Sequence, residues 1–209
     1  DDPNEDVRIA AWTTTPWTLP SNTALCAGPD ISYIKIKTSN PYTHTPVSVV
    51  LAEALVPNWF GGKNQSTVEG QSAAFKGSKM KGIRYEPLLD FGNEIEPLLG
   101  GTDAYLVLTG DHVTTSDGTG IVHTAPSFGA DDQRVAKANG VGTLTLVDQT
   151  GKFKENVGPY SGRYVKDYKD EPGYVAVDID IAIQLKTEGK ALNVQKYEHN
   201  YPHCWRTDK

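Results

Sequence analysis

Glycine and proline recur so often along this chain that its apolar segments stay short. The 209 residues include 20 glycines and 13 prolines. Proline cannot donate a backbone hydrogen bond and glycine readily adopts turn conformations, so both residues tend to end strands and helices. Many short apolar segments separated by such turns are typical of a β-rich fold.

Hydrophobic periodicity within these segments predicts strands and two helices. "ISYIKIK", for example, alternates apolar and polar residues as a half-buried strand does. The predicted strands are Val7–Thr15, Thr23–Cys26, Tyr33–Lys37, Val47–Leu51, Ala104–Leu108, Gly120–His123, Leu144–Val147 and Asn193–Tyr197. One helix is predicted from Ala130 to Gly140, because acidic residues in its first turn suit the helix dipole and glycine ends it. The other covers Val177–Glu188, although "VAVDIDIAI" also alternates like a strand.

The rest of the chain offers few further elements. Gly61–Gly77 is interpreted as a polar, mobile surface excursion. The sequence contains no internal repeat and no domain-scale linker. The chain begins at Asp1, and "DDPNED" has no apolar signal-peptide region, so we expect a piece excised from a larger protein.

Charge and hydropathy limit what this chain binds. The net charge is −6, whereas a domain that grips nucleic acid by itself is usually basic. Any nucleic-acid contact is therefore small, or assisted by other parts of a larger protein. No apolar run approaches the roughly 20 residues that a membrane span needs, so we expect no membrane partner.

The two cysteines, Cys26 and Cys204, give no sign of a complete metal site. Cys26 lies in the apolar run "TALCA" and is expected to be a small buried side chain. Cys204 lies next to His203 and near His199, but no C-x-x-C pair exists to complete a zinc site. Two lone thiols are typical of a reducing, intracellular compartment.

The stretch "AWTTTPWTLPSN" is the first candidate for a functional site. Its β-branched run favours an extended backbone that stops at Pro16, followed by a structured loop. Hydroxyl groups and large rings crowd this stretch and are suited to a polar, flat ligand. A Thr-rich edge strand with Trp12 and Trp17 in the core explains the same residues.

The second candidate is "TTSDGTGIVHTAPSFGADDQRV", residues 114–135. His123 ends a predicted strand, and Asp131 and Asp132 begin a predicted helix, where binding groups are commonly displayed. Asp132 shares a helix face with the apolar residues at i+3 and i+4 and should lean inward, whereas Asp131 shares a face with Arg134. The residues alone are equally compatible with a satisfied, half-buried histidine and with aspartates that only favour the helix start. His112 and Asp111 precede the glycine turn, and no mechanism requires them.

Together, "WTTTPWTLPSN" and "GTGIVHTAPSFGADD" resemble the two signature stretches of the editing (CP1) domain of isoleucyl-tRNA synthetase. Valyl and leucyl relatives are less similar, since they typically follow the first threonines with arginine and proline where this chain has Thr15, Pro16 and Trp17. "GIRYEPLLDF", "YSGRYVKD" and the terminal "HNYPHCWRTDK" also fit the family.

The resemblance implies a single β-rich α+β domain over residues 1–209, barrel-like, with a few peripheral helices. Residues 199–209 would return towards the synthetic core of a cytoplasmic ligase. That parent enzyme would use ATP and magnesium, while the domain itself would need no cofactor and no metal.

The implied activity is post-transfer editing: hydrolysis of the ester bond in mischarged Val-tRNA(Ile), with Ile-tRNA(Ile) excluded. One methylene in a binding pocket is worth only about 1–3 kcal/mol, a limit for which isoleucyl-tRNA synthetase is the usual example. A second, hydrolytic site must therefore remove valine. The implied partners are the tRNA 3′ end, its valine moiety and the parent synthetase.

The resemblance also implies roles for individual residues. Asp132 would bind the α-ammonium of the amino acid, and His123 would help to exclude isoleucine. Trp17 and Thr18 would shape the pocket. The residues that would hold the terminal adenosine and order the attacking water are Thr13, Thr14 and Thr15.

Two other functions compete with this interpretation. One is a non-catalytic module that binds the tRNA 3′ end. The other is a free-standing deacylase that edits in trans.

Overall fold

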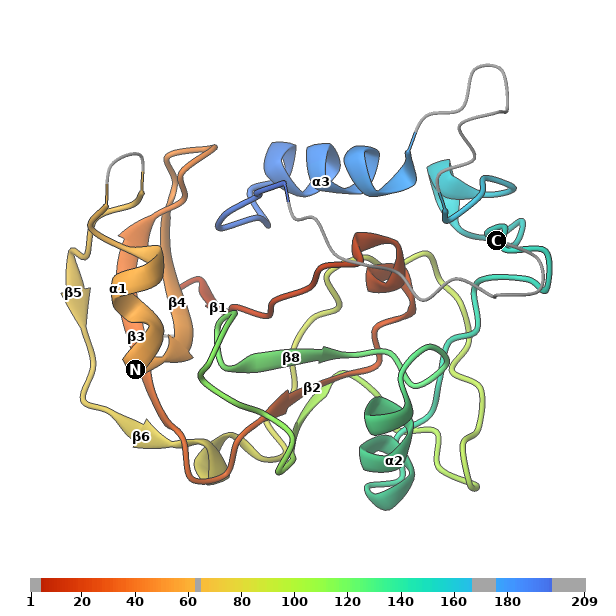
Figure 1. Ribbon diagram of the computed structural model, residues 1–209, viewed down its shortest axis with the longest axis horizontal. Helices are drawn as coiled ribbons and strands as arrows, with labels where there is room; N and C mark the ends of the chain where they lie inside the picture. Colours follow the sequence, from red (N-terminus) through yellow and green to blue (C-terminus); the bar gives the residue numbers. More distant parts are fainter. Residues whose placement is uncertain (1–4, 63–64, 167–175, 197–209) are drawn as a thin grey trace.

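Two β-sheets lie side by side in the computed structural model, which describes residues 5–62, 65–166 and 176–196 (Figure 1). The larger sheet has the strand order β1-β4-β3-β5, and β6 also pairs with β3. Its strands are β1 (Val7–Ile9), β3 (Ser32–Ser39), β4 (Pro46–Ala52), β5 (Gly70–Gln71) and β6 (Phe75–Lys76). The smaller sheet has the order β7-β2-β8. Its strands are β2 (Ala24–Ala27), β7 (Leu106–Thr109) and β8 (Ile121–Thr124).

Short helices surround the sheets. The α-helices of the described residues are α1 (Val56–Trp59), α2 (Ala130–Ala138) and α3 (Val177–Thr187). The 3-10 helices of this part are η1 (Pro16–Ser21), η2 (Glu53–Leu55), η3 (Gly77–Met80) and η4 (Gly158–Tyr160). None of the helices described is long and apolar enough to cross a membrane.

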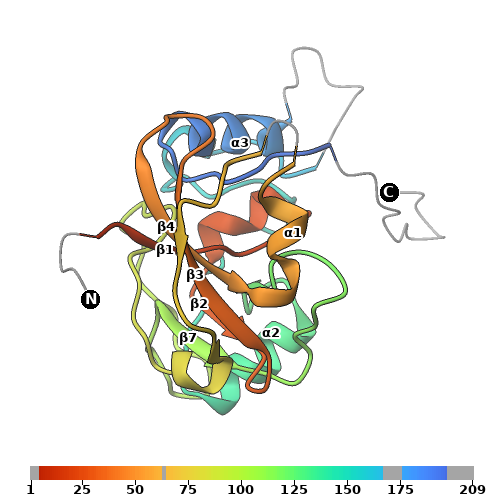
Figure 2. The ribbon, with the colours of Figure 1, turned by 90° about the vertical axis from the view of Figure 1, so that its left-hand side faces the viewer.

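A shared apolar core joins the two sheets. It contains Leu25 of β2, Tyr33 of β3, Val50 of β4 and Ile121 of β8. The Tyr33 hydroxyl donates a hydrogen bond of 2.6 Å to the carbonyl of Gly120 and so ties β3 to the turn before β8. Figure 2 shows the larger sheet from its outer side, with β2 and β7 beyond its lower end.

The turn before β8 requires glycine. Gly120 has a φ of +74°, and a Cβ atom there would lie 2.5 Å from the Cβ of Ala52 in β4. Only glycine combines this backbone conformation with so close an approach. This turn therefore fixes where β8 begins.

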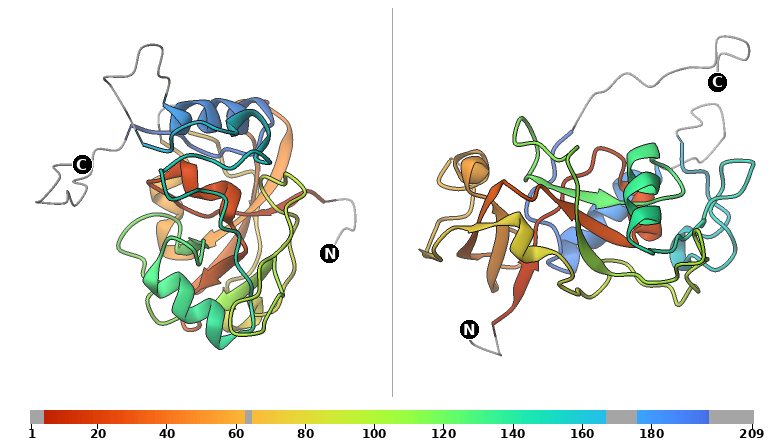
Figure 3. Two further views of the ribbon diagram at one scale, coloured as in Figure 1. Left: turned by 90° about the vertical axis from the view of Figure 1, so that its right-hand side faces the viewer. Right: turned by 90° about the horizontal axis from the view of Figure 1, so that it is seen from below.

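A second core lies between η1 and α3. Leu19 of η1 packs with Val177, Ile181 and Leu185 of α3. Figure 3 shows α3 above η1, on the other side of η1 from the smaller sheet. This packing holds the segment that follows the threonines.

Most of the predicted elements are confirmed. The predicted strands at 23–26, 33–37, 47–51, 104–108 and 120–123 correspond to β2, β3, β4, β7 and β8. The helices predicted at 130–140 and 177–188 correspond to α2 and α3, so the alternating residues from Val177 onwards form a helix and not a strand. The β-rich α+β class with few helices is confirmed, and neither sheet closes into a barrel within the described residues.

Other predictions were wrong. The strand at Val7–Thr15 ends at Ile9, and only an isolated bridge from Trp12 to Val122 follows it. Leu144–Val147 forms no strand, because its apolar residues pack in the core without a partner ladder apart from a bridge at Val147. Gly61–Gly77 is not only a surface excursion, since β5 and β6 pair with β3. Residues 193–196 form no strand; Tyr197, like Cys204, His199 and His203, lies outside the described residues.

Candidate functional site

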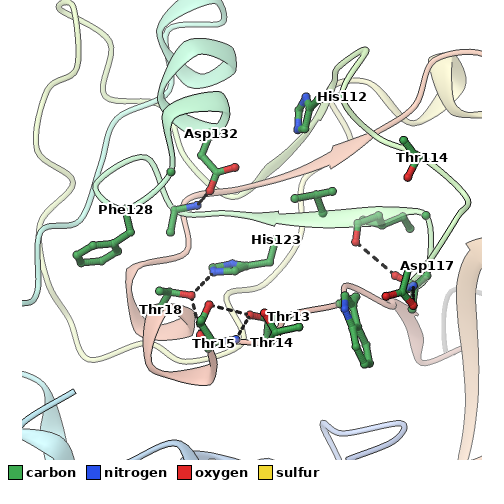
Figure 4. A pocket seen from close by; sticks show the side chains of 18 residues that line it. Thr13, Thr14, Thr15, Thr18, His112, Thr114, Asp117, His123, Phe128 and Asp132 are labelled. Atoms are coloured by element: carbon green, nitrogen blue, oxygen red, sulfur yellow. Dashed lines mark hydrogen bonds between the residues drawn. The ribbon is translucent and has the colours of Figure 1, made fainter. Parts of the chain in front are cut away.

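A pocket of about 380 Å³ opens between the threonine segment, β8 and the start of α2 (Figure 4). Thr13, Thr14, Thr15 and Thr18 line it, together with His123 and Asp132. The structure thus brings together residues of two stretches that are about 100 positions apart in the sequence. Of the predicted site residues, only Trp17 is missing from the lining.

The threonine segment is not a regular strand. The backbone N–H of Thr15 donates a hydrogen bond of 3.1 Å to Thr13 Oγ1, and the Oγ1 atoms of Thr13 and Thr15 lie 3.5 Å apart. Such a local side-chain bond competes with a β ladder. Because the alternation of a regular strand is lost here, all three consecutive threonines reach the same pocket.

The two aspartates of α2 are oriented differently, as the helical periodicity predicts. Asp131 is exposed and forms an ion pair of 3.2 Å with Arg134. Asp132 is half-buried, and its Oδ2 accepts a hydrogen bond of 2.9 Å from the backbone N–H of Ala125. Burial raises the pKa of the Asp132 carboxyl, and this hydrogen bond partly offsets the effect. A cation placed in the pocket would therefore stabilise the charged form of Asp132.

His123 lies at the register position opposite Leu25, and only 8% of its surface is exposed. Both ring nitrogens have partners: Nε2 lies 3.0 Å from Thr18 Oγ1, and Nδ1 lies 2.8 Å from Asn22 Nδ2. Burial lowers the pKa of His123 to about 4, so the imidazole is neutral near pH 7. A neutral ring with both nitrogens occupied acts as a wall of the pocket and is not suited to act as a general base.

The buried histidine makes stability depend on pH. The unfolded chain binds a proton at this imidazole below pH 6.5, whereas the folded chain does so only near pH 4. Unfolding free energy should therefore be highest above this window and fall as the pH is lowered through it, by about 3 kcal/mol at most. Denaturant unfolding between pH 6.5 and pH 4 measures this loss of unfolding free energy. His123→Gln should remove this part of the pH dependence, and the exposed control His44→Gln should retain it. An equal dependence of unfolding free energy on pH in the two variants would contradict the assignment to His123.

Trp17 supports the pocket from outside. Its ring packs edge-on against Phe128, which lines the pocket, with 4.9 Å between the ring centroids. Its backbone N–H donates a hydrogen bond of 2.7 Å to Oδ1 of Asp178 in α3. The 3-10 turn at Pro16 thus directs Trp17 towards α3 and the back of Phe128.

Several residues of the site were not predicted from the sequence. Asp117 lines the pocket at the end away from Asp132 (Figure 4), and Trp12 also lines it. His112 also lines it, and neither ring nitrogen has a hydrogen-bond partner among the described residues. Asn22 and Tyr85 support His123 from behind. Asn22 is the last residue of the first signature stretch, and this position is the one feature of the sequence that points to a role for it.

Acidic, histidine and cysteine side chains do not gather into a metal-binding group in the described ranges. Asp132 is a carboxylate of this pocket, and among the described residues only the N–H of Ala125 donates to it, at Oδ2, which leaves Oδ1 for another donor. Asp132 and Asp117 lie at opposite ends of the lining, so each carboxylate with the hydroxyl groups and the neutral His123 imidazole suits an ammonium and an ordered water better than a metal ion.

Isoleucine–tRNA ligases resemble the chain along almost its whole length. The enzyme of Porphyromonas gingivalis is 40% identical over 250 residues and that of Cytophaga hutchinsonii 43% over 240, each covering 98% of this chain. The enzyme of Treponema denticola is 42% identical and covers 96% of it. The chain spans only 18–21% of the length of these relatives. No family model matches the chain.

Among solved structures, the chain has a lower similarity to leucyl-tRNA synthetase domains. A leucyl-tRNA synthetase CP1 structure gives a TM-score of 0.45 at 18% identity, covering 66% of this chain and 45% of that one. The editing domain of the P. falciparum cytosolic enzyme gives 0.45 at 15% identity, covering 63% and 45%. The ligase sequences carry the identification: at 40–43% identity over 98% of its length, the chain belongs to the isoleucine–tRNA ligase family.

Proposed function

We propose that this chain is the editing domain of an isoleucine–tRNA ligase and hydrolyses the ester bond of Val-tRNA(Ile) while sparing Ile-tRNA(Ile). The observation that carries the proposal is that three consecutive threonines and a half-buried carboxylate line one pocket. Membership of the ligase family supplies the class of substrate.

Asp132 binds the α-ammonium of the esterified amino acid. Its Oδ2 is used by the N–H of Ala125, so Oδ1 remains to accept from the ammonium. The charge of the ligand replaces the solvation that burial removes, and a hydrogen bond between charged groups is about twice as strong as a neutral one. This contact orients the ester with its carbonyl carbon towards the threonines.

The threonines orient the attacking water. Hydroxyl groups both donate and accept, so Thr13, Thr14 and Thr15 can hold a water molecule and the terminal ribose at the same time. The water attacks the carbonyl carbon and the ester C–O bond breaks; a proton from the water passes to the departing ribose oxygen, and valine is released as the free amino acid. Positioning and hydrogen bonding lower the barrier without a covalent intermediate. We propose no metal or cofactor bound by this chain for this step.

His123 limits the size of the amino-acid side chain. The neutral ring is held on both sides and cannot easily move to admit a larger group. The pocket is therefore a fine sieve that admits valine and blocks isoleucine, which is one methylene larger.

The remaining contacts belong to the parent enzyme. A net charge of −6 gives this chain little attraction for the tRNA body, so we expect it to contact only the 3′ end. The rest of a full-length ligase would hold the tRNA and use ATP and magnesium for synthesis. The isolated chain should bind tRNA weakly.

Alanine variants at the three threonines test the proposal. Each of Thr13→Ala, Thr14→Ala and Thr15→Ala should slow deacylation of Val-tRNA(Ile) by roughly tenfold, the loss of one hydrogen bond at about 1.4 kcal/mol. The melting temperature should stay close to that of the wild type, because none of these side chains lies in a core. The assay uses the chain alone and within the full-length ligase. A wild-type domain that binds but does not hydrolyse mischarged tRNA would contradict the proposal.

A further inference from the structure

A line of hydrogen bonds runs from Tyr85, outside the pocket, to the backbone of Thr15 inside it. The Tyr85 hydroxyl lies 2.6 Å from Asn22 Oδ1, and Asn22 Nδ2 lies 2.8 Å from His123 Nδ1. His123 Nε2 lies 3.0 Å from Thr18 Oγ1, which lies 2.9 Å from the carbonyl of Thr15 (Figure 4). The three middle side chains are 7–8% exposed, so water does not replace these partners.

The orientation of the Asn22 amide determines which atoms donate. Asn22 Nδ2 lies 2.8 Å from the carbonyl of Ala24, so a flipped amide would place two oxygens against each other there. In the orientation that avoids this, Oδ1 faces Tyr85 and accepts its hydroxyl hydrogen. Nδ2 then donates to His123 Nδ1, so Nδ1 carries no proton.

The donor from Asn22 also determines which nitrogen of His123 carries the proton. A neutral imidazole without a proton on Nδ1 carries it on Nε2, and Nε2–H donates to Thr18 Oγ1. The single hydroxyl hydrogen of Thr18 is then donated to the carbonyl of Thr15. With the other tautomer, Thr18 would have to donate to Nε2, and Thr15 would lose this bond.

We propose that Tyr85 is a positioning residue of the pocket: together with the Ala24 carbonyl it fixes the Asn22 amide, and through Asn22 it holds His123 as the Nε2–H tautomer, which leaves the Thr18 hydroxyl free to anchor Thr15. Tyr85 is not part of the pocket lining and does not touch the substrate. The consequence for hydrolysis rests on the proposed function, whereas the control of the tautomer does not.

Backbone hydrogen bonds and ring packing hold Tyr85 in position beside Asn22. The N–H of Tyr85 donates to the carbonyl of Tyr105, and the N–H of Tyr105 donates to the carbonyl of Thr23, next to Asn22. The Tyr85 ring packs edge-on against the Tyr105 ring with 6.1 Å between centroids. Tyr85→Phe therefore removes the hydroxyl and leaves the ring in place, and Tyr105→Phe is a matched control in the same cluster.

Nitrogen NMR of the His123 imidazole tests the tautomer directly in the 209-residue chain. The wild type and Tyr105→Phe should give the signature of a single Nε2–H tautomer. Tyr85→Phe should move both ring nitrogens towards the values of a tautomer mixture. An unchanged Tyr85→Phe spectrum, or equal shifts in both variants, would overturn the proposal. If Tyr85→Phe does not fold, Tyr85→Leu, which also lacks the hydroxyl, is measured in its place, and a single Nε2–H tautomer in that variant would overturn the proposal.

Kinetics in the full-length ligase separate this proposal from the editing function. Tyr85→Phe should lower kcat for Val-tRNA(Ile) deacylation severalfold with KM unchanged, because Thr15 is loosened while Asp132 still binds the ammonium. Tyr105→Phe should match the wild type. A wild-type enzyme without deacylase activity would refute the proposed function and leave the NMR result to decide the tautomer. An active wild type with an unaltered kcat in Tyr85→Phe would refute the link to hydrolysis.

Discussion

Replacing Asp132 with alanine is expected to slow Val-tRNA(Ile) deacylation by roughly a hundredfold, since a hydrogen bond to a charged group contributes about 1.5–3 kcal/mol. In the free protein the carboxylate is half-buried and its only hydrogen bond in the described structure comes from Ala125. An ammonium placed in the pocket without Asp132 would lose its charged partner. The loss should appear in KM as well as in kcat, because the contact is already made when the substrate binds.

Two further variants control this experiment. Asp132→Asn keeps an oxygen that can accept from Ala125 but removes the charge, so it should fold normally and still lose activity. Asp131→Ala removes an exposed carboxylate whose ion pair with Arg134 is screened by solvent, and its activity should be nearly that of the wild type. Similar losses in the two alanine variants would show that the wrong carboxylate was assigned.

Replacing His123 with alanine should allow the domain to hydrolyse correctly charged Ile-tRNA(Ile). The space left by the ring can accept the extra methylene, whose exclusion is worth about 1–3 kcal/mol, so the preference for valine should fall by tenfold or more. The variant should also be less stable, because Thr18 and Asn22 lose a buried partner. Deacylation rates for both charged tRNAs, with the melting temperature of each variant, measure the two effects.

A bulkier substitution distinguishes size from chemistry at this position. His123→Gln keeps most of the volume and an amide that can donate and accept, so it should still spare isoleucine. If His123→Ala also spares isoleucine, the size limit lies elsewhere in the lining, for example at Thr18 or Phe128. If both variants admit isoleucine, the ring itself rather than its bulk sets the limit.

Local sequence signals were sufficient for the elements whose stability is local. α2 begins at Ala130 with Asp131 and Asp132 in its first turn, as the charge pattern predicts. The opposite orientations of these aspartates follow from the 3.6-residue period alone. β3 has the alternating burial that "ISYIKIK" predicts along most of its length.

Strand pairing was less predictable because an apolar pattern reports burial and not the position of a hydrogen-bonding partner. Leu144 and Leu146 are buried as predicted, yet they pack against Phe153 and Val157 without a ladder. The segment after Ile9 has the propensity of a strand, but the hydroxyl of Thr13 binds the backbone of Thr15 instead. β5 and β6 are too short to be recognised, and they exist because the edge of β3 accepts them.

By itself the sequence determined the family, the two signature stretches and the residue types that the chemistry needs. These properties are carried by contiguous residues, and the resemblance was specific because both stretches are long. Only the tertiary structure decided which side chains meet: Trp17 lies behind Phe128, and Tyr85 binds Asn22, 63 residues away in the chain, which in turn binds His123. Such contacts depend on how β2, β8 and η1 pack together, and packing between distant segments leaves no periodic signal in any one of them.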